Sequence, residues 1–123
     1  INIEQNKALV DLAKPFPCTF HRAFDKVSNY EKALEDVISC GFSTILTSGT
    51  FPNVMEGKYV LKQLVIQANN RIEIMLGGGL RSTNISALDE MVNINWFHSS
   101  AITDGSEIAS LEEIVQLKKK LQS

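Results

Sequence analysis

Charged side chains interrupt an apolar segment early in the chain, where residues 18–25 read CTFHRAFD. His21, Arg22 and Asp25 supply an imidazole, a guanidinium and a carboxylate, which together can move protons and neutralise a bound anion. Burying such groups without partners costs several kcal/mol, so we expect them at the exit of a strand rather than inside it. An ion pair between Arg22 and Asp25 that only ties the strand to its loop is the alternative interpretation.

Three later apolar segments also end in small or polar residues: Thr47-Ser48-Gly49, Gly77-Gly78-Gly79 and His98-Ser99-Ser100. Turn formation alone explains any one of them. Four such groups at one sheet edge favour a site, because glycine N–H groups and serine hydroxyls can hold an anion. The predicted catalytic residues are His21, Arg22, Asp25 and His98. The predicted anion-binding residues are Ser48, Gly77, Gly78, Gly79, Ser99 and Ser100.

Alternating helical and extended patterns must position these residues. Strands are expected at 18–24, 43–47, 71–76 and 94–97. Helices are expected at 3–14, from Ser28 to Gly41, from the loop after Pro52 to about residue 69, from Asn84 to Met91, and from Ser110 onward. Ser28 with Glu31 and Ser110 with Glu113 form capping-box patterns, and Gly41 is a typical helix C-cap. The last helix carries a predicted buried stripe of Leu111, Ile114, Leu117 and Leu121.

Four β-α units in succession predict a parallel sheet with helical crossovers. A complete (β/α)8 barrel takes about 250 residues, so 123 residues correspond to half of one. We therefore expect an α/β fold: the second half of a TIM barrel, forming a single partial domain over residues 1–123. Its open edge would be covered by a missing N-terminal half, which we favour, or by another copy in a homo-oligomer. A small open sheet is the third possibility.

Composition and charge narrow the possible partners. A net charge of -2 without a clustered basic face argues against nucleic acid, and no apolar run approaches the length of a membrane span. The first residues lack the pattern of a secretory signal, and the two cysteines form no disulfide framework, so a cytoplasmic location is expected. Cys18 and Cys40 are expected to be ordinary buried thiols toward the sheet edge opposite the site.

The four strand-exit segments, taken in order, resemble the signature segments of the CutC family. They read TFHRAFD at 19–25, ILTSG at 45–49, IMLGGGL at 74–80 and HSSA at 98–101. The resemblance extends over nearly the whole chain and corresponds to the C-terminal half of a TIM barrel. It implies a cytoplasmic protein of copper homeostasis. The family usually has a glutamate two residues before the last histidine, where this chain has Trp96, so His98 lacks that carboxylate partner.

Three functional hypotheses follow. The first is a copper-homeostasis protein with copper as a possible ligand; this rests on the resemblance alone, and its metal ligands stay open. The second is a TIM-barrel enzyme acting on a small anionic or phosphorylated metabolite, with the glycines and serines holding the anion. The third is an assembly piece without chemistry of its own.

Overall fold

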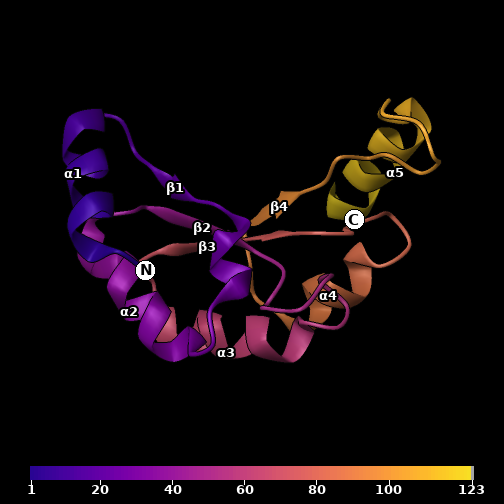
Figure 1. Cartoon of the computed structure of the whole chain (residues 1–123). Coiled ribbons are helices and arrows are strands. Elements are labelled where there is room, and N and C mark those ends of the chain that lie inside the picture. Colours follow the sequence, from indigo (N-terminus) through magenta and orange to yellow (C-terminus); the bar gives the residue numbers. More distant parts are fainter. Residues whose placement is uncertain (123) are drawn as a thin grey trace.

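The computed structural model describes residues 1–122 and contains a four-stranded parallel sheet in the order β1-β2-β3-β4 (Figure 1). The strands are β1 (Thr19–Phe20), β2 (Thr44–Thr47), β3 (Glu73–Gly77) and β4 (Trp96–His98). Each strand pairs with the next one along the chain. The predicted succession of parallel β-α units is therefore confirmed, with the strand ends displaced by at most four residues.

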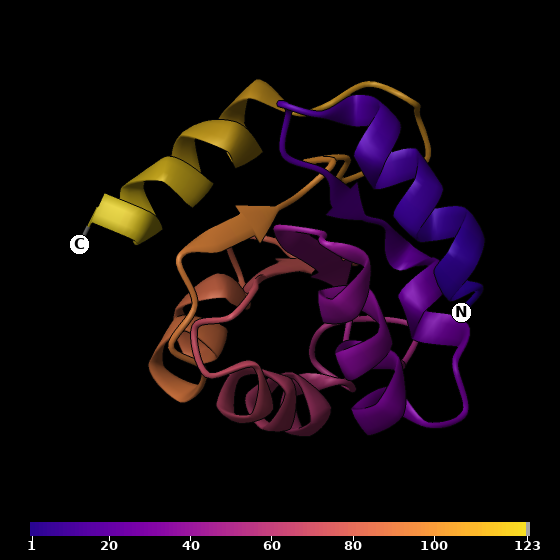
Figure 2. The same cartoon turned by 90° about the vertical axis from the view of Figure 1, so that its left-hand side faces the viewer.

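Five α-helices and one 3-10 helix accompany the strands. They are α1 (Ile3–Ala13), η1 (Arg22–Lys26), α2 (Tyr30–Cys40), α3 (Lys58–Ala68), α4 (Ile85–Met91) and α5 (Leu111–Gln122). Seen from one side of the sheet, the α-helices form an arc around the strands (Figure 2). The core lies between the sheet and α2, α3 and α4, where fully buried residues include Leu34, Ile45, Leu61, Leu76 and Leu88.

The expected strand at 18–24 is wrong beyond its first residues. Only Thr19 and Phe20 pair with β2, and the chain then turns into η1. His21 begins this turn, because its Nδ1 accepts the Ala23 N–H at 3.0 Å. Phe24 is completely buried and anchors η1 in the core. The extended strand therefore stops after Phe20, and the polar residues come from a helical turn.

The start of α2 also differs from the prediction. Asn29, not Ser28, caps the helix, and its side-chain oxygen accepts the Lys32 N–H at 3.1 Å. Asparagine is at least as good an N-cap as serine, so the cap lies one residue later than the Ser28–Glu31 pattern indicated. Gly41 ends α2 with φ 96°, as expected for a C-cap.

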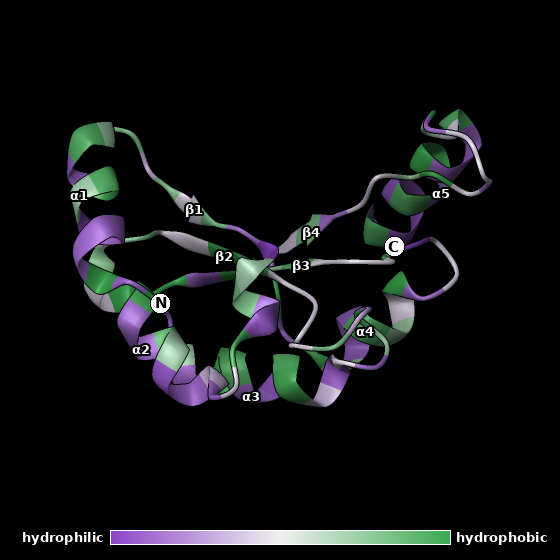
Figure 3. Ribbon diagram, viewed as in Figure 1, coloured by the Kyte–Doolittle hydropathy of each residue, from purple (hydrophilic) through white to green (hydrophobic). Residues whose placement is uncertain are grey.

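The first and last helices, α1 and α5, carry many hydrophobic residues (Figure 3), and several of these residues are exposed. No described residue of α5 is buried, so the predicted buried stripe is wrong; only Leu117 packs partly against the core. In α1 only Val10 is buried, whereas the neighbouring Leu9 is 63% exposed. The helix α1 packs beside α2, and α5 packs beside α4.

Candidate functional site

Asp25 is the centre of the hydrogen-bond network at the carboxyl edge of β2. Its carboxylate accepts from Arg22 Nε at 2.8 Å and from the backbone N–H groups of Ser48 and Thr50 at 3.1 Å each. The hydroxyls of Thr47 and Ser48 donate to it as well. Only 8% of the side chain is exposed. Asp25 therefore fastens η1 to the loop after β2.

The hydrogen-bond donors around Asp25 determine its protonation state. Burial raises the pKa of this carboxyl group, but hydrogen bonds from Thr47, Arg22, Thr50 and Ser48 outweigh it, and the pKa lies below its usual value. The group is thus ionised at neutral pH and surrounded by donors. This chemistry is that of an anchor that orients Arg22.

The side chain of Arg22 turns back toward the strand exits. Its Nη2 donates to Ser48 Oγ at 2.8 Å and to the Pro52 carbonyl at 3.4 Å. The guanidinium of Arg22 also lies close to Gly78: a Cβ added to Gly78 would be 2.9 Å from Arg22 Cζ. Gly78 also has φ 116°, which side chains rarely adopt, so glycine is needed here for two reasons.

Arg81 is a site residue that the sequence analysis missed. Its guanidinium donates to the carbonyls of Leu80 and Ile102 and to the hydroxyls of Ser99, at 3.1 Å, and Ser100, at 3.2 Å. It thereby joins the loop after β3 to the loop after β4. A cation just past three glycines was the available signal, because such glycines let a nearby charge approach a ligand.

Arg22 and Arg81 meet at a cavity of about 210 Å³ above the ends of β3 and β4. The other residues that line it are Gly78, Gly79, His98, Ser99 and Ser100. No carboxylate belongs to this lining. The hydrogen-bond acceptors of Arg81 are carbonyl and hydroxyl oxygens, all neutral, whereas Asp25 offsets part of the charge of Arg22. The cavity is therefore positively charged and suited to a small anion.

Two predicted anion-binding residues lie outside this lining. Ser48 is buried behind Arg22, and Gly77 packs against the strands, where an added Cβ would lie 2.5 Å from Leu46 Cδ1. Ser48 and Gly77 therefore lie beside the cavity but do not line it.

His21 also lies elsewhere. It lines an apolar groove of about 470 Å³ between α1 and the open edge of β1, together with Cys18 and Leu9. Cys40 is buried at the end of α2, and its burial raises the pKa of the thiol. Residues 1–122 contain no group of three histidine, cysteine, aspartate or glutamate side chains placed to hold a metal ion.

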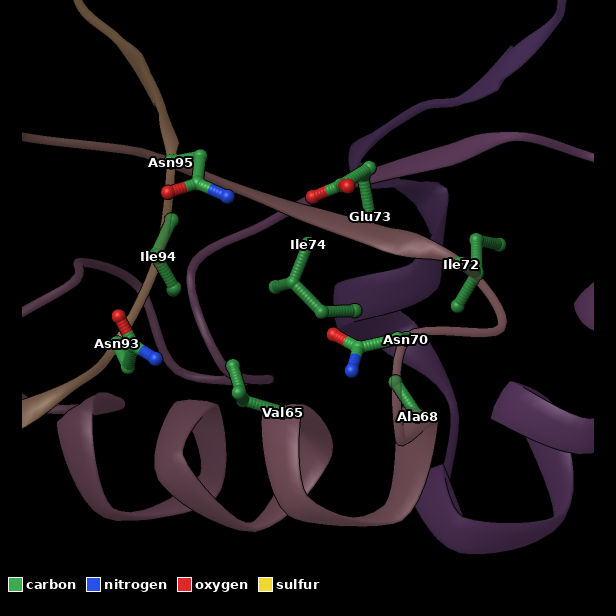
Figure 4. A pocket seen from close by; sticks show the side chains of 9 residues that line it. All are labelled: Val65, Ala68, Asn70, Ile72, Glu73, Ile74, Asn93, Ile94 and Asn95. Atoms are coloured by element: carbon green, nitrogen blue, oxygen red, sulfur yellow. The ribbon is translucent and has the colours of Figure 1, made fainter.

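A small cavity of about 70 Å³ lies at the opposite sheet edge, between α3 and the starts of β3 and β4 (Figure 4). The side chains of Asn70, Glu73, Asn93 and Asn95 border it. Pairing of β3 with β4 begins only at Met75 and Trp96, so the chain segments before those residues are not held together. The cavity is explained by this separation, and it is remote from the predicted site residues.

No helix within residues 1–122 is long and apolar enough to cross a membrane.

The chain is similar to known proteins in sequence and in fold. A model described as the CutC family matches residues 1–103. A "copper homeostasis protein cutC homolog" of Caenorhabditis elegans is 32% identical, over 94% of this chain and 53% of its own length. The homolog of Mus musculus is 44% identical, over 76% of this chain and 35% of its own length.

A solved structure shows the same fold. The crystal structure of the putative copper homeostasis protein CutC from Streptococcus agalactiae superposes with a TM-score of 0.76 and 33% identity. The match covers 84% of this chain and 51% of that one. The chain thus spans about half of that protein, or less of some relatives. Its sequence and fold place this chain in the CutC family.

Proposed function

We propose that this chain forms the C-terminal half of a CutC-type barrel that acts in copper homeostasis, and that it binds a small oxyanion at the strand exits. The cavity between Arg22 and Arg81 is the observation that carries the proposal. Two guanidinium groups face one small space, and the single neighbouring carboxylate, Asp25, is saturated by its own donors. A bound anion would offset the remaining positive charge.

The copper role is proposed because the relatives are named copper homeostasis proteins. Direct coordination by this half would need His21 and His98, but these line different pockets. Copper also accepts thiolates, yet Cys18 and Cys40 do not join a three-ligand group within residues 1–122. The free thiols support a reducing compartment, so we place the protein in the cytoplasm.

A second candidate function is a barrel enzyme that acts on the bound anion. His98 favours it, because its imidazole lines the same cavity as the two arginines. Asp25 would then orient Arg22 and leave proton transfer to His98. His21 would stay outside the reaction, since its Nδ1 already accepts the Ala23 N–H.

The anion site is tested by thermal unfolding of the chain in increasing inorganic phosphate, with chloride at matched ionic strength as reference. We expect the melting temperature to rise with phosphate, by the equivalent of about 2.7 kcal/mol at a hundredfold excess over Kd. Gly78→Ala should abolish this rise, because the added methyl group displaces Arg22. Gly105→Ala is the matched control, since nothing lies within 4 Å of an added Cβ there. An equal rise in chloride, or none in phosphate, would contradict the proposal.

The copper question has a separate test. Titration with copper(II), followed by equilibrium dialysis, should show no stoichiometric binding by this chain at neutral pH. Stoichiometric binding that is lost in a His21→Ala, His98→Ala double variant would show instead that the two histidines form a site. Loss in a Cys18→Ala, Cys40→Ala variant would assign copper to the thiols.

A further inference from the structure

We infer that the anion is the phosphate group of a phosphomonoester whose apolar part lies against Phe51 and Pro52. This inference rests on the proposed anion site and adds the class of its ligand. It comes from a second depression that adjoins the cavity and shares Arg22 with it.

The second depression is an open groove of about 700 Å³ between η1 and the loop after β2. Ala23, Thr50, Phe51 and Pro52 line it together with three charged residues, Arg22, Asp25 and Lys26. The cavity alone, at about 210 Å³, is smaller than the roughly 300–1,000 Å³ of most small-molecule sites. The cavity and groove together provide that space, with one polar and one mainly apolar part.

Arg22 connects the two parts physically. Its Nη2 donates to the Pro52 carbonyl and to Ser48 Oγ. The single hydroxyl hydrogen of Ser48 is shared between the Phe51 carbonyl, at 2.5 Å, and Asp25 Oδ2, at 3.0 Å. The guanidinium and the Phe51–Pro52 turn are thus held in one hydrogen-bond network. A ligand whose phosphate contacts Arg22 would have its next atoms beside this turn.

The loop is rigidly placed although its aromatic ring is exposed. Thr50 has a left-handed backbone, with φ 67°, and Asp25 accepts its N–H. A non-glycine residue in this region costs free energy, and such strain is typical of positions that serve binding. Phe51 nevertheless remains 46% exposed. Covering an aromatic ring with an apolar group is favourable, so the exposed ring is suited to the body of a ligand.

The charges around the groove select the class of ligand. Lys26 lies at the groove and forms no ion pair with a carboxylate of residues 1–122. With Arg22 and Arg81 it makes three cations around the combined space, against the single, saturated Asp25. A phosphate dianion joined to an apolar group fits this distribution better than a neutral or cationic molecule.

Isothermal titration calorimetry with two probes, inorganic phosphate and phenyl phosphate, tests the inference. Phenyl phosphate should bind about tenfold more tightly, because its ring covers Phe51. Phe51→Ala should remove that advantage while leaving the affinity for inorganic phosphate unchanged, which also shows that the variant is folded. Phe16→Ala is the matched control, as an exposed phenylalanine in the loop between α1 and β1.

The outcomes separate the two proposals. Equal affinities of the two probes for the original chain, or an equal loss in Phe51→Ala and Phe16→Ala, would overturn the ligand class and leave the anion site in place. Failure of both probes to bind would overturn the anion site and this inference with it.

Discussion

Arg22 and Asp25 lie one helical turn apart in η1, yet they serve different parts of the site. Asp25 points into the loop after β2 and is satisfied by its hydroxyl and N–H donors, whereas Arg22 extends to the cavity. The ion pair between them, expected as the plainer interpretation, exists at 2.8 Å. It also orients the guanidinium toward Gly78, so it contributes to the geometry of the candidate site.

The network around Asp25 makes a prediction about acid stability. Its pKa is lower in the folded chain than in the unfolded one, so its contribution is present above the unfolded pKa near 3.9 and is lost as pH falls through the folded value. Asp25→Asn should lower the free energy of unfolding at pH 7 by about 1–3 kcal/mol, because the amide leaves N–H donors unsatisfied. Below pH 3 the difference from the original chain should shrink.

Urea unfolding between pH 7 and pH 2 measures this difference. Asp104→Asn is a suitable control, since Asp104 is exposed and its pKa is lowered by Ser106 alone among side chains. A constant difference between the original chain and Asp25→Asn across the pH range would show that the pKa of Asp25 is not lowered by folding.

Part of the candidate site was predicted from residue types in the sequence. Gly78, Gly79, Ser99 and Ser100 were predicted because glycines and serines after strands favour anions, and the structure places all four at one cavity. The position of His21 could not be predicted, because the pattern did not reveal that β1 ends at Phe20. That end depends on a local hydrogen bond and on the burial of Phe24.

At the scale of elements, α5 depends on few contacts. It has no buried residue among those described, but Glu113 in its first turn accepts from the N–H and, at 2.8 Å, the hydroxyl of Ser82. Ser110 caps the helix by accepting the Glu113 N–H at 3.2 Å. The predicted capping box is therefore present only in part, because the Glu113 side chain binds the loop after β3.

We expect Glu113→Ala to loosen α5 without unfolding the sheet. Removing the carboxylate leaves the Ser82 groups unpaired and detaches the first turn of the helix. Hydrogen–deuterium exchange should become at least several-fold faster in α5 and stay unchanged in α2 and α3. Glu112→Ala, at the neighbouring position, is the control and should leave α5 exchange nearly as it was. Unchanged exchange in Glu113→Ala would show that partial packing of Leu117 is sufficient.

The alternation of elements was predictable at the scale of the whole molecule, because apolar periodicity reports which face of each segment is buried. The helix ends at Gly41 and the polar strand exits follow from local chemistry. The exposure of α5 could not be predicted from the sequence, since an apolar stripe has the same pattern whether or not a partner covers it. The chain spans 53% of the Caenorhabditis elegans relative and 51% of the Streptococcus agalactiae protein.

The open edges of the sheet predict how the chain behaves alone. β1 and β4 each have one unpaired edge, and apolar side chains on α1 and α5 lie beside them. Exposed edges and apolar faces favour association, so the purified chain should form oligomers or precipitate rather than remain a 13.6 kDa monomer. Sedimentation velocity over a hundredfold concentration range measures this association.

Leu9→Lys, which places a charge in the groove beside β1, should weaken association. Ile66→Lys, on the exposed side of α3, should not, because α3 lies away from both open edges. A monomer that persists at every concentration would mean that the open edges are stable in water, and the chain would then need no second half to cover them.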